Sequence, residues 1–433
     1  MTPGTDRRRG WLRRHAIDVR PLRHAAYRRL FLGGAVSFFG FQFTAVAVPV
    51  QVYQLTGSSL WVGLLGVAGL VPLLVFAPWG GAVTDALDRR VVLLASSLLA
   101  WVATLGLLAQ ALLRLGNPYL ILGLVAVQAA AFAVSNPARQ AILPSIVPAA
   151  EVASANTLGF TVSNAASVAG PLTAGLVIAG TDIAVAYAVD AAAFTVALWA
   201  AARLPALPPT AAAPDPHGDP VQKPDPPVRA RSGGLRDMVA GFRYLAASQL
   251  ILLTFAIDLA AMVLAMPRAL FPEVAAERFG ASAIGWLYSA IALGSMLAGV
   301  SSGWVSRVRR QGLAIIVAVA VWGLAVAAAG AAPWLWLVLA FLALAGAADL
   351  VSAVFRQTLF QTYAPAAMQG RLQGVFFVVV AGGPRLGDLR IGATAQWFGP
   401  TVAWVGGGLA AAAVALLIGA AFPVLRRYAI ARP

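Results

Sequence analysis

The chain of 433 residues contains no cysteine and only three histidines. Without cysteine, disulfide bonds and thiolate metal sites are excluded. His15, His24 and His217 all lie in polar segments, so no imidazole is available for a metal cluster within the apolar segments. Hydrolytic or redox chemistry there has few candidate residues, and we expect neither a metal nor another cofactor.

Charged side chains are scarce: they make up 11% of the chain, hydrophobic residues make up 60%, and the mean hydropathy is +0.81. This is too little polar surface for a soluble globule of this length. Long apolar runs repeatedly reach the ~20 residues that a helix needs to cross the hydrocarbon core. The sequence therefore predicts an all-α membrane protein. No phosphate-binding glycine-rich loop is present, so we expect neither ATP hydrolysis nor another enzyme activity.

The apolar runs predict twelve membrane-spanning helices in two sets of six. We expect spans near residues 30–53, 60–83, 91–113, 118–142, 155–179 and 183–203, then 246–271, 283–305, 312–331, 334–359, 372–396 and 401–424. The stretch "ALPPTAAAPDPHGDPVQKPDPPVRARSGG" between the sets is too rich in proline and charge to bury a core. The expected organisation is a basic tail (1–27), a six-helix half (28–204), a linker (205–242), a second half (243–425) and a tail (426–433).

Arginine is unevenly divided between the two sides that these spans define. If both termini are cytoplasmic, that side holds the nine arginines before residue 30 and most arginines of the short loops, whereas the outer side holds only Arg114, Arg268 and Arg278. The positive-inside rule then predicts a multi-pass protein of the cytoplasmic membrane with both termini inside. The net charge of +15 thus points to the lipid bilayer rather than nucleic acid as a partner, and we expect a monomer.

The chain contains an internal repeat. The stretch "SNPARQAILPSIVPAAEVASANTLGF" (135–160) aligns without gaps with "SAVFRQTLFQTYAPAAMQGRLQGVFF" (352–377), and Arg139 falls opposite Arg356 at an offset of 356 − 139 = 217. The same offset sets "GPLTAG", from Gly170 to Gly175, opposite "GDLRIG", from Gly387 to Gly392. Two parallel six-helix repeats with a site at their interface are the architecture of the major facilitator superfamily.

Short motifs carry the resemblance further. The stretch "GGAVTDALDRRVVLL" resembles the superfamily's cytoplasmic loop motif through Gly81, Asp85, Arg89 and Arg90, although Ala86 and Asp88 depart from its common form. The stretch "AGPLTAGLVI" resembles the antiporter motif of the fifth helix, carried here by Gly170, Pro171 and Gly175. In the fourth helix, "GLVAVQAA" around Gln128 lacks the arginine of the antiporter pattern, so coupling through that arginine is unsupported.

Together, "YQLTGSSLWVG", "NPARQAILPSIVP", "YAVDAAAF" and "GGPRLGDLRIG" resemble the enterobactin exporter branch of bacterial efflux proteins over nearly the whole chain. The resemblance implies a secondary transporter that works by alternating access. It implies proton-coupled export of a hydrophobic or amphipathic small molecule, such as a siderophore or a drug-like compound. Two alternatives stay open: a facilitator or importer of a small metabolite in the same fold, and a transporter-like sensor or lipid-handling protein.

Charged residues inside predicted spans are functional candidates, because an ionisable group in hydrocarbon costs at least ~2.5–3.5 kcal/mol on insertion scales. Asp258 lies near the middle of the seventh span. Burial disfavours a charged carboxylate, which suits a proton carrier. The alternative for Asp258 is a hydrogen bond to a Ser or Thr of a neighbouring helix. Asp190 in the sixth span fits either role.

Two further groups of charges stand in the second half. Asp349, Ser352 and Arg356 recur at i, i+3 and i+7 and so share one helical face. For Arg356 and its repeat mate Arg139 we expect a gate or structural role, with the side chains snorkelling or pairing with loop carboxylates. On the eleventh span, Arg385 and Asp388 can pair at i, i+3, with Arg390 near the outer interface. Both a cavity lining and an ion-pair lock between the halves remain open for them.

The loop motif suggests a latch, in which Asp85 near a helix N-terminus pairs with Arg89 or with an arginine of the other half. The predicted gate residues are Gly81, Asp85, Asp88, Arg89, Arg90, Arg139 and Arg356. The predicted residues for proton coupling and the substrate cavity are Asp258, Asp190, Asp349, Arg385, Asp388, Arg390, Gln42 and Gln128. Trp286, Trp334 and Trp336 fall near predicted helix ends, where we expect interface anchors rather than a ligand cage.

Overall fold

The computed structural model describes residues 18–206, 243, 248–363 and 366–429. Within these ranges the chain forms helices and no strand, as the sequence predicts. Residues 1–17 of the predicted basic tail, residues 207–242 of the predicted linker and the last four residues lie outside the described ranges.

The first half contains six long helices and two short 3₁₀ turns. The turns are η1 (Arg20–Arg23) and η2 (Ala149–Glu151), and the long helices are α2 (Ala25–Thr56), α3 (Ser59–Ala86), α4 (Arg89–Leu112), α5 (Pro118–Ile146), α6 (Val152–Gly180) and α7 (Ile183–Ala202). Asp88, Asn117 and Asp182 cap the N-termini of α4, α5 and α7 by accepting backbone N–H bonds. Gly57, with φ of 60°, ends α2 in the left-handed conformation that favours glycine.

The second half also contains six long helices, with more irregular connections. Its elements are α9 (Gln249–Ala265), η3 (Arg268–Leu270), α10 (Phe271–Val274), the π-helical turn η4 (Ala275–Phe279), α11 (Ala283–Val300), η5 (Ser302–Arg307), α12 (Gln311–Ala331), α13 (Leu335–Tyr363), α14 (Ala366–Phe398), α15 (Pro400–Ala421) and α16 (Pro423–Arg427). Eleven helices of the described chain are long and apolar enough to cross a membrane. The remaining predicted span, 372–396, corresponds to α14, which carries Arg385, Asp388 and Arg390.

The predicted seventh span, 246–271, falls largely within the candidate span Gln249–Phe279 but is not one continuous α-helix. The helix α9 stops at Ala265, and Met266 adopts an extended conformation with ψ of 116°. The cause is Pro267, because a proline disfavours the helical conformation of the residue before it and has no N–H for a helical hydrogen bond. The chain continues through η3 and α10 instead, so backbone groups at this end of α9 need partners from elsewhere.

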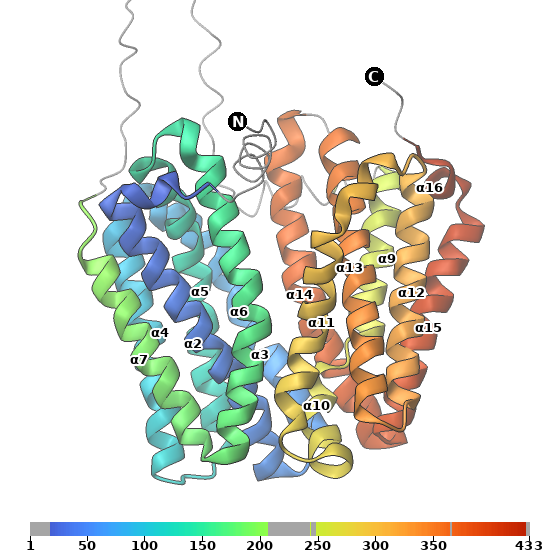
Figure 1. Ribbon diagram of the computed structural model, residues 1–433, viewed down its shortest axis with the longest axis horizontal. Helices are drawn as coiled ribbons and strands as arrows, with labels where there is room; N and C mark the ends of the chain where they lie inside the picture. The colour runs from blue at the N-terminus through green and yellow to red at the C-terminus, as the bar shows by residue number, and fades with distance from the viewer. Residues whose placement is uncertain (1–17, 207–242, 244–247, 364–365, 430–433) are drawn as a thin grey trace, which may run out of the picture.

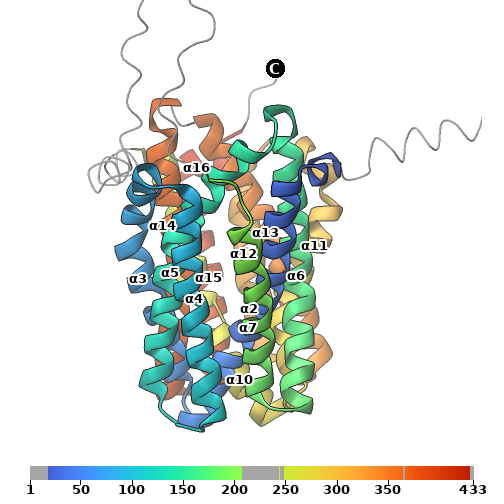
Figure 2. The ribbon, with the colours of Figure 1, turned by 90° about the vertical axis from the view of Figure 1, so that its left-hand side faces the viewer.

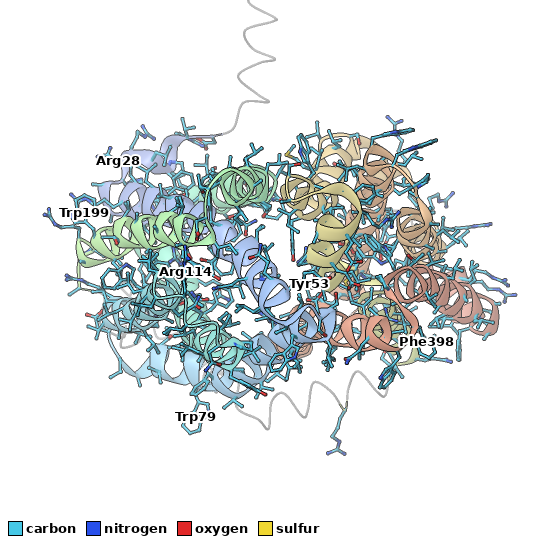
Figure 3. All side chains as sticks on the ribbon, turned by 90° about the horizontal axis from the view of Figure 1, so that it is seen from below. Arg28, Tyr53, Trp79, Arg114, Trp199 and Phe398 are labelled. Atoms are coloured by element: carbon cyan, nitrogen blue, oxygen red, sulfur yellow. The ribbon has the colours of Figure 1, made fainter. Side chains whose placement is uncertain are left out.

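The two halves stand side by side as separate bundles, with α2 to α7 in one and α9 to α15 in the other (Figure 1). All the long helices run between the same two ends of the molecule (Figure 2). The start of the described chain and α16 lie at one end, which we name the terminal face; the opposite end, with the turn after α2 and with α10, is the far face. Side chains of Trp79, Trp199 and Phe398 lie on the outer rim (Figure 3).

The halves meet along two helix pairs, α3 with α14 and α6 with α11. On α3, Gly63 and Gly66 lie directly against the backbone of Asp388 and Arg385, and Gly175 of α6 lies against Gly285 of α11. These glycines let the backbones approach closely, as small residues do between membrane helices. All of these positions fall in the half of each helix nearer the far face, so this packing closes the far face.

We predict that Gly66→Leu opens the far face. A leucine there meets the backbone of Arg385, and such overpacking costs about 1–3 kcal/mol, which is roughly a 5- to 140-fold shift in population. Because the chain has no native cysteine, a single Ser289→Cys reporter at the α6–α11 contact reveals the change through its reaction with an impermeant maleimide added from the far side.

Gly123→Leu is the matched control, since a side chain at Gly123 meets nothing within 4 Å. The control should leave the labelling rate of the reporter at position 289 unchanged. Equal labelling rates in the Gly66→Leu variant and the parent would contradict closure through this packing.

Candidate functional site

Asp258 and Arg356 form a buried ion pair between α9 and α13. Oδ1 of Asp258 contacts Nη1 of Arg356, and the two residues are 4% and 6% exposed. The expectation that Arg356 snorkels or pairs with a loop carboxylate is therefore wrong, and the structure gives Asp258 an arginine partner rather than the Ser or Thr of the alternative interpretation. Two charges remain at membrane depth because each offsets the desolvation of the other.

The pair is surrounded by apolar side chains and a very small cavity. Ile251, Phe255, Leu359 and Phe360 line a space of about 10 Å³ beside the two charges, which is at the lower limit for a single water molecule. Within the described residues, Nε of Arg356 has no hydrogen-bond partner. The site can therefore hold its charges, or accept a proton, without contact with a large body of water.

The first half does not reproduce this pair. Arg139, the repeat mate of Arg356, is half-buried, and its guanidinium lies against Gly34 of α2. Among the described residues Arg139 makes no ion pair. Among the described residues the buried ion pair is thus present in the second half only, which makes the two repeats chemically unequal.

Asp190 is the buried carboxylate of the first half. It is 1% exposed, and its Oδ2 accepts a hydrogen bond of 2.5 Å from Oγ1 of Thr44 on α2. Its Oδ1 has no partner within the described residues. Gly40 lets α2 approach the backbone of α7 at this residue. Asp190 therefore lies inside the first bundle, away from the contact between the halves.

Two charged side chains of α14 form hydrogen bonds with backbone groups where α9 ends. Nη2 of Arg390 donates a 2.5 Å hydrogen bond to the carbonyl of Leu264, one of the last carbonyls of α9. Asp388 accepts a hydrogen bond from the backbone of Ala269, just after the break. The last carbonyls of any helix lack intrahelical donors, and water does not reach the end of α9 because Ala265 and Met266 are buried in the protein. This explains why an apolar span contains charged residues.

Arg385 and Asp388 are electrostatic neighbours, but among the described residues they do not form the ion pair that their spacing allowed. Nη1 of Arg385 donates to the carbonyl of Ala381 on its own helix at 3.1 Å, and the side chain runs beside Gly69 of α3. Arg268 acts electrostatically on both Asp388 and Asp349. Arg385 is thus the α14 charge that faces the other half.

Two predicted glutamines lie within the first half. The side chain of Gln42 packs against Gly170 of α6. Nε2 of Gln128 donates a hydrogen bond of 2.8 Å to Oγ1 of Thr104 on α4. These contacts place Gln42 at the α2–α6 contact and Gln128 at the α4–α5 contact. Pro171 stands inside α6, and its carbonyl approaches Gly285.

The loop motif ties helices together within the first half. Asp88, not Asp85, occupies the N-terminus of α4, where it accepts a 2.8 Å bond from the N–H of Arg90. Asp85 lies in the last turn of α3, so the expected dipole stabilisation at a helix N-terminus is wrong for it. Arg89 donates to the carbonyl of Ala141 on α5, and Arg90 to that of Ala202 on α7. These two arginine contacts stay within one half.

Two glutamates that were not predicted from the sequence join the halves at the far face. Oγ of Ser59 donates to Glu273, and the hydroxyl of Tyr53 donates to Glu277 at 2.9 Å. Tyr53 lies where the two bundles meet (Figure 3). The four-residue spacing of acids in "FPEVAAERFG", directly after an apolar run, was the available signal. Both carboxylates lie on the segment between α9 and α11.

The chain resembles known transporters in sequence and in structure. The model of the transmembrane secretion effector family matches residues 17–430. Enterobactin exporter EntS of Shigella boydii serotype 18 and that of Escherichia coli O139:H28 are each 30% identical to this chain over 418 residues, 94% of both proteins.

Solved transporter structures share the fold. The nucleoside transporter NupG superposes with a TM-score of 0.70 at 14% identity over 93% of this chain and 99% of its own. A bacterial homologue of the iron transporter ferroportin in an inward-facing state gives 0.65 at 14% identity, over 93% and 98%. With the two six-helix halves and the matched length, these similarities establish that the chain is a multi-pass membrane transporter of the transmembrane secretion effector family, within the major facilitator superfamily.

Proposed function

We propose that this transporter exports an amphipathic small molecule in exchange for protons, and that Asp258, paired with Arg356, is the proton site. The buried ion pair between α9 and α13 is the observation that carries the proposal. Export is supported by the relatives named as enterobactin exporters. That relationship favours a siderophore or a compound of similar amphipathic character as the substrate.

Proton exchange at Asp258 has a direct structural consequence. When the carboxyl group is ionised, it neutralises Arg356 and links α9 to α13. When it is protonated, Arg356 keeps its charge without a counterion, and an unpaired buried charge is strongly unfavourable. The protonated state therefore favours a rearrangement that gives the guanidinium another partner or water, and this is how a proton biases a conformational equilibrium.

The direction of transport is inferred from the relatives named as enterobactin exporters. The contacts between the halves lie toward the far face, so in the proposed cycle this conformation precedes the opening of that face. The arginine distribution favours the cytoplasm on the terminal side of the bacterial inner membrane. Substrate then enters from the cytoplasm, and a proton reaches Asp258 after the far face opens.

A facilitator is the second candidate, because the coupling arginine of the fourth helix is absent. The corresponding helix here, α5, carries the uncharged Gln128, whose side-chain amide already donates a hydrogen bond to Thr104. A facilitator moves its substrate without proton exchange, so a single experiment on proton movement separates the two functions.

Coupling through Asp258 can be tested in everted membrane vesicles with an acidified lumen. Adding catecholate siderophores or lipophilic drugs should release lumenal protons in the wild type and not in Asp258→Asn, which cannot exchange a proton. Lumenal pH is followed with a fluorescent probe. Asp182→Asn is the control, since Asp182 is an exposed helix cap that asparagine can replace. Substrate uptake without proton movement in the wild type would leave a facilitator.

Stability measurements separate the coupling role of the pair from its structural role. Removing one partner, in Asp258→Asn or Arg356→Gln, should destabilise the protein by about 3–5 kcal/mol, whereas the double variant Asp258→Leu/Arg356→Met should recover most of this loss. Thermal unfolding in detergent measures the effect. The stable double variant should still lack proton release. Proton-coupled export by the double variant would contradict the assignment of Asp258 as the proton site.

Alternating access should respond to the far-face hydrogen bonds. Tyr53→Phe combined with Ser59→Ala removes both bonds to the glutamates, each worth about 1.5–3 kcal/mol because the acceptor is charged. The far face should open more often, and labelling of the Ser289→Cys reporter from the far side should accelerate about tenfold or more. The exposed Tyr119, changed to Phe, is the matched control and should show no acceleration. Unchanged labelling in the double variant would exclude a latch at Glu273 and Glu277.

A further inference from the structure

An aromatic groove opens on the far face of the second half, apart from the contact between the halves. It lies between the start of α11, the turn from α12 to α13, and η4, and its volume is about 580 Å³. Its wall is formed chiefly by Trp286, Trp334, Trp336 and Leu339, with Arg278 at one side. A volume of this size falls in the range of small-molecule sites, roughly 300–1,000 Å³.

The three tryptophans of this groove are unusually open. Trp334 and Trp336 stack with ring centroids 6.0 Å apart and an interplanar angle of 8°. They are 59% and 64% exposed, and Trp286 is 48% exposed. Large apolar surfaces gathered in one place are normally covered by a partner or by lipid. In a transporter, tryptophans at helix ends lie at the level of the lipid headgroups.

Arg278 brings a positive charge to the same groove. Its Nη2 donates a 2.7 Å hydrogen bond to the carbonyl of Ala332, and its guanidinium lies 5.0 Å above the ring of Phe279. These contacts fix the guanidinium but do not neutralise it, and among the described residues Arg278 forms no ion pair. The neighbouring carboxylate of Glu277 is instead directed to Tyr53.

We propose that this groove binds one anionic phospholipid of the far-face leaflet. The phosphate lies against Arg278, and the upper part of an acyl chain covers Trp334, Trp336 and Leu339. Charge complementarity and the interfacial depth of the groove single out this occupant, because a basic group beside an apolar wall at a helix end matches both parts of the lipid. A transported substrate has no access here without leaving the path between the halves, since every lining residue belongs to the second half.

The experiment uses the full chain reconstituted in phosphatidylcholine vesicles, with phosphatidylglycerol or phosphatidylcholine carrying brominated acyl chains as the quencher of tryptophan fluorescence. The chain has twelve tryptophans, so the difference in quenching between the parent and Trp334→Phe/Trp336→Phe isolates the groove. In the parent, brominated phosphatidylglycerol should quench this component at a mole fraction about tenfold lower than brominated phosphatidylcholine does, which corresponds to about 1.4 kcal/mol.

Variants of Arg278 test whether its charge causes the preference for phosphatidylglycerol. Arg278→Gln should abolish the preference for phosphatidylglycerol, and Arg278→Lys should retain part of it, since lysine keeps the charge but not the planar fork. Arg114→Gln removes another arginine of the far face, and the preference should persist. Two outcomes would overturn the proposal: equal quenching by both lipids in the parent, or an unchanged preference for phosphatidylglycerol in Arg278→Gln.

Discussion

The break in α9 after Ala265 is the constraint on which the rest of the second half depends. A helix that ends inside the protein leaves carbonyls and N–H groups without intrahelical partners, and buried groups of this kind need partners from neighbouring helices. Arg390 and Asp388 of α14 supply those partners at Leu264 and Ala269. The helix α14 is therefore held against α9 by polar contacts as well as by packing. The same helix also makes much of the contact with the first half, through α3.

The same break directs the chain toward the far face. From the end of α9 the segment through η3, α10 and η4 brings Glu273 and Glu277 to Ser59 and Tyr53 of the first half. Asp258 lies on the helical stretch just before the break. The proposed proton site and the far-face contacts thus lie on one continuous stretch of chain, from α9 through η3 and α10 to η4. A change in the pairing of Asp258 therefore has a short physical route to the closure between the halves.

The two repeats share a backbone plan but differ in the chemistry of their interiors. The second half holds an acid and a base in contact, whereas the first half sets Arg139 beside Gly34 and isolates Asp190 with Thr44. The repeat relationship alone does not reveal this difference, because the offset aligns Arg139 with Arg356 while their surroundings diverge. In the proposed mechanism, the second half responds to the proton through Asp258 and Arg356, and the first half provides the surface against which it moves.

Sequence by itself determined the membrane class, most of the helical spans and the division into two halves, because these follow from local properties: the length of apolar runs and the placement of proline and glycine. It also identified Asp258, Arg356 and the α14 charges as unusual, because a charge in an apolar run is visible without a structure. Pro267 signalled the early end of α9, yet the apolar run around it predicted a longer span.

Only the tertiary structure decided which groups meet. Asp258 and Arg356 are 98 positions apart (356 − 258), and Tyr53 meets Glu277 across the boundary of the halves, so neither pairing has a local signature. The spacing of Arg385 and Asp388 suggested an ion pair, yet Asp388 instead accepts a hydrogen bond from the backbone N–H of Ala269. A charged side chain in the membrane takes the partner that the packing of distant helices presents, and that packing is a property of the folded chain as a whole.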